Sequence, residues 1–381
     1  MDINQGSVFS NLNLDDPDMS TMDLIRGSIQ LDGSYEHGIN SLNWRLKAAA
    51  QQDTIGWSDM ADVYSAYLSV KPDPSLALAI GKKSYKWGKG YAWNPVGFIN
   101  RPKDPNDPEE ALEGYVTLES DFIKSFQGSL QTAALTLAVL PVWEDINEDF
   151  GERDNVNLAG KLYLLYMDTD IDLIFLTGNS RSNRIGLDFS TNLAPHFEIH
   201  GEAAYIPKLK KIVLLEDNSS SIEEQKAFST LLGIRYLTEN EITSIIEYYY
   251  NGGGYSEEEM TRFYQMAATG FSRNPTLGSD LLDRAREMSM KGYGRPQPGR
   301  QYLYAKFTQK EPFDILYFAP GITTIVNLED QSYSISPEAV YTGLTNWEFR
   351  LRFSLINGGE FTEYGEKVNS NKLELRIRYF F

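Results

Sequence analysis

The chain has 381 residues, with 35 Lys and Arg against 53 Asp and Glu, a formal net charge of −18 and no cysteine. These totals exclude a disulfide scaffold, a thiolate metal site and a cysteine nucleophile, and the acidic balance argues against nucleic acid as a partner. No apolar run approaches the roughly 18 to 20 residues of a membrane-spanning helix, and the first residues lack a signal segment, which leaves a cytoplasmic protein or a mature chain whose leader was removed.

Apolar and polar residues alternate along much of the chain. Residues 25–36 show this pattern first, and residues 197–205, 347–355 and 373–381 repeat it. Successive side chains of a strand point to opposite faces, so each segment places one stripe against apolar surroundings and the other against water. We therefore predict strands at 24–36, 40–52, 59–71, 74–85, 113–123, 128–141, 156–168, 170–179, 183–193, 196–206, 226–237, 240–251, 300–309, 313–326, 333–343, 346–357 and 370–381.

The connections between these strands alternate between short and long. The tight connections lie near 38–39, 72–73, 127–128, 169 and 238–239. The long connections are 86–112, 142–155, 207–225 and 252–299. Outer-membrane barrels have short periplasmic turns and long extracellular loops. Since the turn after 24–36 is short, that strand runs down from the cell surface, and we expect an upward strand before it at Ser7–Leu14, which gives about 18 strands, within a range of 16 to 18.

A soluble sandwich or barrel also shows alternation, but its apolar face fills one finite core. These strands offer more apolar face than one core could hold. The pattern favours an all-β fold: a single domain over residues 1–381 that forms a transmembrane, antiparallel, up-and-down β-barrel, apolar outside and polar inside. The residues expected to line its lumen are Arg26, Asp32, Arg45, Lys47, Asp188, Glu198, Glu202, Arg235, Glu247, Arg350, Arg352, Glu374, Arg376 and Arg378.

The segment 86–112 combines glycines and prolines, which favour a fixed non-helical path, with four basic residues in an acidic protein. One interpretation is a loop that folds into the barrel and narrows it. The other is an ordinary surface loop whose aromatic residues are packing or interface groups. In the first case a positive constriction would consist of Lys86, Lys89, Arg101 and Lys103.

The segment 252–299 is predicted to be a helical insertion. Ser256 and Glu259 have the spacing of a capping box, and apolar residues follow at helical intervals. Gly270 is expected to end this helix, and a second is expected from about Ser279. The pair could be an extracellular cap, a lumen plug or a docking surface, and a self-packed extracellular loop is the favoured interpretation.

Catalytic and metal-binding patterns are sparse. His37, His196 and His200 are the only histidines, and no nucleophile elbow or glycine-rich phosphate loop is present. His196, Glu198, His200 and Glu202 share one strand face, but strand neighbours diverge, so we interpret them as lumen-lining groups and expect no enzyme activity, cofactor or metal. Two acidic groups either hold divalent cations at the lipopolysaccharide surface or are solvated: Glu144, Asp145, Glu148 and Asp149, and Glu216, Asp217, Glu223 and Glu224.

The chain ends in Tyr379 and Phe381, preceded by apolar residues at alternate positions, namely Leu373, Leu375 and Ile377. This end resembles the targeting signal of bacterial outer-membrane β-barrels, and residues 81–95 with 101–108 are similar to a pattern in porin-like barrels. The resemblance implies that the barrel-assembly machinery reads Tyr379 and Phe381. It also implies an integral protein of the bacterial outer membrane, surrounded by lipid and lipopolysaccharide, whose mature chain has lost its signal peptide.

Such a barrel is expected to act as a porin-like channel for passive passage of small polar or charged solutes. The alternative is a sheath or scaffold that docks a partner protein, for example a multihaem electron-transfer protein or a surface lipoprotein, without a free solute path. Both lumens are lined by the same residue types, so the sequence leaves both open.

Overall fold

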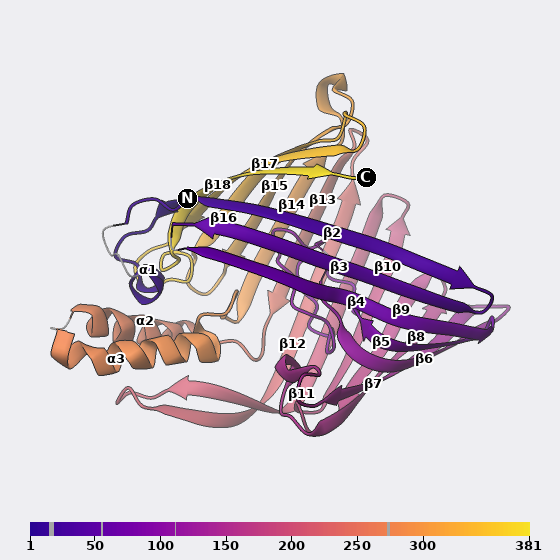
Figure 1. The fold of residues 1–381 in the computed structure, drawn as a ribbon, viewed down its shortest axis with the longest axis horizontal. Helices are drawn as coiled ribbons and strands as arrows, with labels where there is room; N and C mark the ends of the chain where they lie inside the picture. Colours follow the sequence, from indigo (N-terminus) through magenta and orange to yellow (C-terminus); the bar gives the residue numbers. More distant parts are fainter. Residues whose placement is uncertain (15–18, 55, 111, 273–274) are drawn as a thin grey trace. The chain divides into compact units, whose positions relative to one another are not determined.

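The computed structural model describes residues 1–14, 19–54, 56–110, 112–272 and 275–381. Residue 111 of the segment 86–112 and residues 273–274 of the insertion 252–299 therefore lie outside the described residues. Eighteen β-strands dominate the fold, and within each of two compact units the paired strands run antiparallel (Figure 1). No helix among the described residues is long and apolar enough to cross a bilayer.

One compact unit comprises residues 24–209 and 226–232. Each of its strands pairs with the next along the chain, as in a meander. These strands are β2 (Leu24–His37), β3 (Asn40–Asp53), β4 (Trp57–Asp73), β5 (Leu76–Lys83), β6 (Tyr115–Ser125), β7 (Leu130–Val142), β8 (Asn155–Tyr166), β9 (Thr169–Thr177), β10 (Arg184–Ala194) and β11 (Phe197–Leu214), whose end belongs to the other unit.

The other compact unit comprises residues 1–23, 210–225 and 233–381. Its meander consists of β13 (Ile242–Tyr250), β14 (Gln301–Gln309), β15 (Phe318–Asn327), β16 (Tyr333–Tyr341), β17 (Trp347–Asn357) and β18 (Asn369–Tyr379), and the short β1 (Asp2–Ile3) pairs with β18. The strand β12 (Ser220–Leu237) contributes residues to both units.

All seventeen strands predicted from alternation are present, most within two or three residues of the expected bounds. Two connections differ. The expected loop 207–225 is mostly strand, because β11 continues to Leu214 and β12 begins at Ser220, with a tight turn closed by Leu215 and Ser219. The strand expected at 313 begins at Phe318, since Pro312–Asp314 form a short 3-10 turn.

The predicted strand at Ser7–Leu14 is wrong, because residues Val8–Asn13 form a helix, α1. The hydroxyl of Ser7 accepts a hydrogen bond from the Ser10 amide at 3.2 Å and so caps the first turn. Val8, Phe9 and Leu12 then fall on one helical face and are buried. The extended residues that precede the helix are those of β1.

The insertion 252–299 is helical, as predicted, with α2 (Glu257–Ser272) and α3 (Pro275–Met288) side by side (Figure 1). The capping box is confirmed: Glu259 N donates to Ser256 Oγ at 3.2 Å, and Ser256 N donates to Glu259 Oε2 at 2.7 Å. Gly270 does not end α2, because it lies where α3 crosses, and a Cβ there would be 2.9 Å from the amide nitrogen of Leu282. The second helix begins at Pro275 rather than near Ser279, since proline suits the first turn of a helix.

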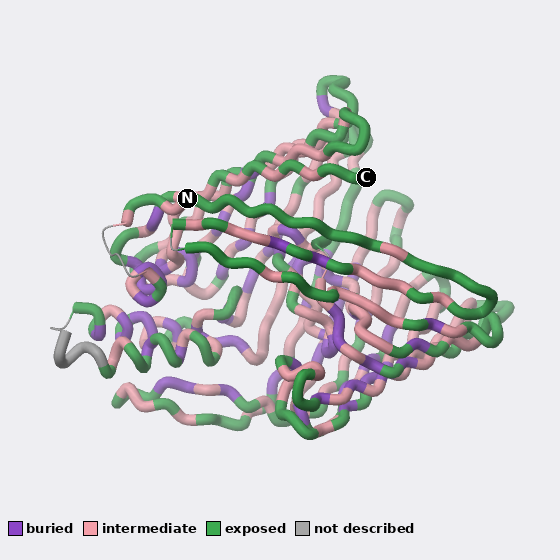
Figure 2. Tube along the Cα trace, in the orientation of Figure 1, coloured by how far each residue is buried: buried purple, intermediate pink, exposed green. Residues whose placement is uncertain are grey.

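The buried faces of α2 and α3 pack with α1 into a core of their own (Figure 2). Phe263, Tyr264 and Tyr293 are fully buried there, and Phe9 of α1 lies 6.1 Å from Phe263 between ring centroids. The insertion therefore packs against the N-terminal segment of its own unit.

The last two strands show the predicted alternation of exposure. Leu351 and Leu375 are cross-strand partners and are 49% and 66% exposed, whereas Arg352, the next residue along β17, is 7% exposed. An apolar stripe is therefore the outward one, which is the reverse of a soluble barrel. Exposed leucine, isoleucine and aromatic side chains continue along β2 to β5, and β2 is exposed along most of its length (Figure 2).

Candidate functional site

Residues 84–114 connect β5 to β6, and we call them the inner segment. This connection lies on the charged face of the strands in its unit. Near one end of this inner segment, Glu110 accepts a hydrogen bond from Lys47 Nζ of β3 at 3.0 Å. Its middle contacts β9, β10 and β11 through the residues described next. Because its contacts extend from β3 to β11, the inner segment covers the polar face rather than projecting away from the sheet.

Glu202 of β11 holds the inner segment through main-chain amides. Its Oε1 accepts from the amides of Lys89 and Gly90, both at 2.7 Å, and its Oε2 accepts from the Val96 amide at 3.2 Å. The side-chain amide of Asn94 adds a further donor at 2.8 Å. A carboxylate that is only 3% exposed thus has four donors, which is how a buried charge is stabilised.

Lys89 lies beside a row of carboxylates on three adjacent strands. Asp172, Asp188 and Glu202 are register partners on three adjacent strands, so their side chains share one face. Lys89 Nζ lies 3.1 Å from Asp172 and 3.9 Å from Asp188. Burial by itself would lower the pKa of Lys89, but attraction by these two carboxylates more than offsets burial and leaves the pKa above its ordinary value. The lysine is therefore charged at neutral pH.

Apolar side chains of the inner segment form a core with the same face of the sheet. Trp87, Val96, Phe98 and Ile99 are all at most 5% exposed. They belong to one cluster with residues of β7, β8, β9 and β11, namely Ala138, Leu140, Ala159, Ile174, Leu176 and Ala204. Gly186 of β10 permits this approach, because a Cβ there would be 2.8 Å from Val96 Cγ1.

The four basic residues expected at a constriction have different surroundings. Lys89 is paired as described, and Arg101 forms ion pairs with Asp149 and Glu113. Lys103 Nζ donates to the carbonyl oxygen of Gly90 at 2.9 Å. Lys86 is exposed and has no hydrogen bond or ion pair to any residue that the structure describes.

Several of the predicted lumen-lining residues in the unit of residues 24–209 and 226–232 lie on its polar face. Asp188 is fully buried, and Arg45 makes a two-point contact with its register partner Asp32, at 2.7 and 3.3 Å. Glu198 lies 3.4 Å from His200 Nδ1. Arg26 is exposed near the start of β2.

In the other unit, several of the predicted lumen-lining residues form ion pairs. Arg352 donates twice to Glu338 Oε2, at 3.1 and 2.7 Å. Arg378 also pairs across strands, with Glu348 at 3.4 Å, whereas Arg376 pairs with Glu374 of its own strand, β18, at 3.1 Å. Glu247 is fully buried, Arg350 is half-buried, and Arg235 is exposed.

Within the described part of the chain, no three histidine, aspartate or glutamate side chains are placed to hold a metal ion. His196 lies in the turn before β11, while His200 packs edge-on against Tyr91 with 5.3 Å between ring centroids. Of the acidic loop groups, Glu148 pairs with Arg153 and Asp149 with Arg101. These contacts are those of structural ion pairs.

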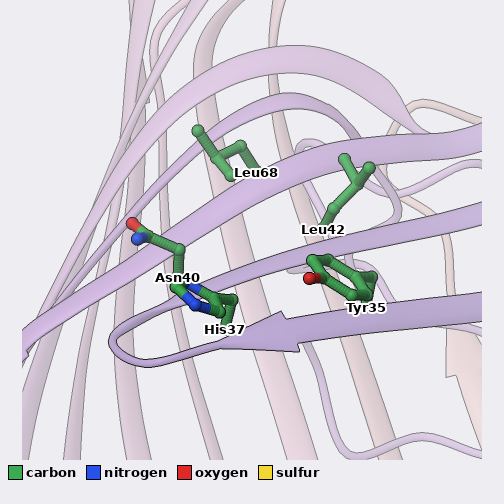
Figure 3. Close-up of a pocket in the computed structure, with 5 residues that line it drawn as sticks. All are labelled: Tyr35, His37, Asn40, Leu42 and Leu68. Carbon is green, nitrogen blue, oxygen red and sulfur yellow. The ribbon is translucent and has the colours of Figure 1, made fainter.

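A shallow pocket of about 350 Å³ lies beside the tight turn between β2 and β3 (Figure 3). Its walls include Tyr35, Leu42 and Leu68, which belong to the exposed apolar stripe, with His37 and Asn40 at the turn. The pocket is therefore part of the outward face and is unrelated to the inner segment.

The sequence analysis did not predict the apolar surface of β7, β8, β9 and β11 against which the inner segment packs. Its signal was nevertheless present, because residues 137–142 and 173–176 interrupt the alternation with Leu, Ala, Val, Pro, Ile and Phe at consecutive positions. A strand that is apolar on both faces has apolar surroundings on both. One side faces outward and the other meets Trp87, Val96, Phe98 and Ile99.

The solved structures that share this fold include two outer-membrane proteins. Wzi of Escherichia coli, an outer membrane protein involved in group 1 capsule assembly and a carbohydrate-binding β-barrel, has 11% sequence identity and a TM-score of 0.52 over 87% of this chain and 74% of its own. OccAB3 of Acinetobacter baumannii has 10% identity and a TM-score of 0.50 over 93% and 91%. No family model and no curated protein matches the sequence. The predicted fold is confirmed: the chain is an antiparallel, up-and-down β-barrel of the outer-membrane type.

Proposed function

We propose that this protein is a porin-like channel of the bacterial outer membrane, through which small polar or charged solutes pass passively, and that its inner segment narrows the passage. The observation that carries the proposal is the position of residues 84–114 on the charged face, held there by Glu202, Asp172 and Asp188. A polar face lined by paired charges offers solutes a hydrated route, and a segment fixed across it limits their size.

The outward stripe of exposed apolar side chains supports the membrane location, because water would not favour so many of them. Lipid and lipopolysaccharide are the surroundings proposed for that stripe. Assembly through the terminal aromatic residues Tyr379 and Phe381 belongs to the same proposal, and both side chains are exposed. No enzymatic role is proposed.

The sheath alternative needs a lumen that is available to a partner protein. In the unit of residues 24–209, the chain's own segment already covers the face between β7 and β11 with a packed apolar core. This arrangement favours a channel with a built-in constriction over a sheath around another protein.

Planar-bilayer recordings of the purified protein test the proposal. We expect ohmic conductance, and replacement of Lys86, Lys89, Arg101 and Lys103 by Gln should shift the reversal potential toward cations. Lys86→Gln and Lys103→Gln together should give most of that shift, because carboxylates already pair with Lys89 and Arg101. Absence of conductance in the intact protein and in a variant without residues 252–299, together with a stoichiometric protein partner from native membranes, would favour the sheath.

A further inference from the structure

We infer that Asp172 and Asp188 share one proton beneath the inner segment, and that loss of this proton weakens the docking of the segment and so widens the passage. This inference rests on the proposed channel function and adds a form of regulation to it. The two aspartates are register partners on β9 and β10, and both residues are at most 1% exposed. They lie in the row of carboxylates beside Lys89.

Asp188 has the fewest donors of the three carboxyl groups in that row. Glu202 accepts four hydrogen bonds from the inner segment, and Asp172 lies 3.1 Å from Lys89 Nζ. Lys89 Nζ is 3.9 Å from Asp188, and neither oxygen of Asp188 accepts a hydrogen bond from a residue that the structure describes. An ionised carboxylate would be buried there with no donor of its own, which is strongly unfavourable. A protonated Asp188 avoids this and can donate a hydrogen bond to Asp172.

Repulsion between neighbouring carboxyl groups favours the same protonated state. Ionisation of both aspartates would place two negative charges side by side, with Lys89 shared between them and Lys161 3.9 Å from Asp172. One shared proton removes the repulsion and leaves a single negative charge, which Lys89 balances. The titratable groups on the elements around Asp188 are Lys161 and Tyr163 of β8, Asp170 and Asp172 of β9, Glu198, His200 and Glu202 of β11, and Lys89 and Tyr91 of the inner segment. Carboxyl groups outnumber lysines among them, which also favours a neutral Asp188.

The inner segment affects this proton because it covers the aspartates. Glu202, which holds the main chain of the segment, is the register partner of Asp188 on β11. Val96 of the segment lies so close to β10 that a Cβ at Gly186 would be 2.8 Å from its Cγ1. Gly186 precedes Asp188 by two residues and is therefore on the same face of the strand. Release of the segment would return Asp188 to the water of the lumen, where its ionised form is stable.

Docking of the segment therefore favours the protonated pair. The docked state is fully stabilised below the pH at which the released pair loses its proton, and this stabilisation is lost as the pH rises through the value at which the docked pair ionises. A second negative charge would attract Lys89 more strongly, but a lysine that already pairs with Asp172 offsets little of the burial of a further charge. The passage should consequently widen in alkali.

Infrared spectra of the purified full-length protein, in a detergent without ester groups, test the shared proton. A protonated carboxyl group has a carbonyl stretching band that an ionised carboxylate lacks. We expect such a band at about pH 7 that is lost in Asp188→Asn and in Asp172→Asn. Asp32→Asn is the matched control and should retain it, because the Asp32 carboxylate pairs with Arg45 on the polar face of β2. A wild-type spectrum identical in this region to that of Asp188→Asn would overturn the inference.

Hydrogen exchange tests the link between the proton and the segment. After correction for the intrinsic pH dependence of exchange, protection of the Lys89 and Gly90 amides should fall about tenfold from about pH 6 to pH 9 in the wild-type protein and in Asp32→Asn. Asp188→Asn cannot ionise at this position and should keep its protection throughout. An unfolded variant would instead lose protection at every pH. The same fall in Asp188→Asn as in the wild-type protein would refute the link.

Conductance measured on the same preparations separates this inference from the proposed function. Conductance should rise with pH in the wild-type protein and stay constant in Asp188→Asn. A protein that conducts, but whose conductance and amide protection do not change with pH, would overturn the proton switch and leave the channel intact. A barrel that does not conduct, but that shows the carboxyl band and the pH-dependent exchange, would retain the switch and refute the channel.

Discussion

Glu202 Oε1 accepts a hydrogen bond of 2.7 Å from the main-chain amide of Gly90, a residue 112 positions earlier in the chain. A main-chain donor fixes the path of the inner segment whatever its side chains are. The neighbouring amide of Lys89 donates to the same oxygen, so the two contacts set both the position and the direction of the segment.

Glu202→Gln should loosen the inner segment without unfolding the barrel. Loss of the charged acceptor should weaken the docking by about 2 kcal/mol, and the amides of Lys89 and Gly90 should exchange with deuterium about 30-fold faster. Glu239→Gln, in an exposed turn, is the control and should leave those amides protected. Equal protection in both variants would show that the carboxylate does not hold the segment.

Gly186→Val should displace the inner segment, because the added Cβ would be 2.8 Å from Val96 Cγ1. Overpacking of this kind costs about 1 to 3 kcal/mol, and urea unfolding should show the loss. Conductance should rise as the segment moves. Gly27→Val is the matched control, since a Cβ at Gly27 meets nothing within 4 Å, and similar conductance in the two variants would contradict the prediction.

Leu375→Arg should destabilise the barrel by about 2 to 4 kcal/mol in lipid vesicles, since residue 375 belongs to the outward stripe. Arg376→Leu should cost less, because its partner Glu374 keeps a contact of 2.8 Å with Lys372. Arg352 is a poor comparison, because Glu338 is 8% exposed in its side chain and removal of one partner from a buried pair is costly. If Arg376→Leu destabilised the barrel more than Leu375→Arg, the apolar stripe would face inward.

The start of α2 should be sensitive to acid. Burial by itself would raise the pKa of Glu259, but hydrogen bonds from Lys211 and the Ser256 amide hold it below its ordinary value of 4.5. A lowered folded pKa stabilises the helix at pH above about 4.5, and this stabilisation is lost as the pH falls through the folded pKa.

Limited proteolysis from about pH 7 to pH 3 measures this loss. Cleavage within α2 should increase with acid in the wild-type protein, whereas Glu259→Gln should be cleaved readily at every pH. Glu257→Gln, at an exposed position in the same turn, should behave as the wild-type protein does. Acid-independent cleavage of the wild-type protein would refute the role of Glu259.

The alternation of apolar and polar residues predicted the fold, because successive residues of a strand face lipid and lumen in turn. It failed at Ser7–Leu14, where Val8, Phe9 and Leu12 fit a helical face as well as a strand and a capping serine decides between them. A segment of eight residues contains too few repeats of either pattern to distinguish a helix from a strand. The partners of Lys89 and Arg101 also lay beyond prediction, since they depend on where the inner segment meets the sheet.

The inner segment leaves the sheet after β5, yet its apolar partners are on β7, β8, β9 and β11. The apolar surface against which it packs is therefore complete only after strands that follow it in the sequence have paired. A barrel built from its N-terminal strands would leave Trp87 and Phe98 exposed until β7 to β11 had paired. Addition of strands from the C-terminal side would present the finished surface when the segment arrives, and would protect these side chains from aggregation and proteolysis during membrane insertion.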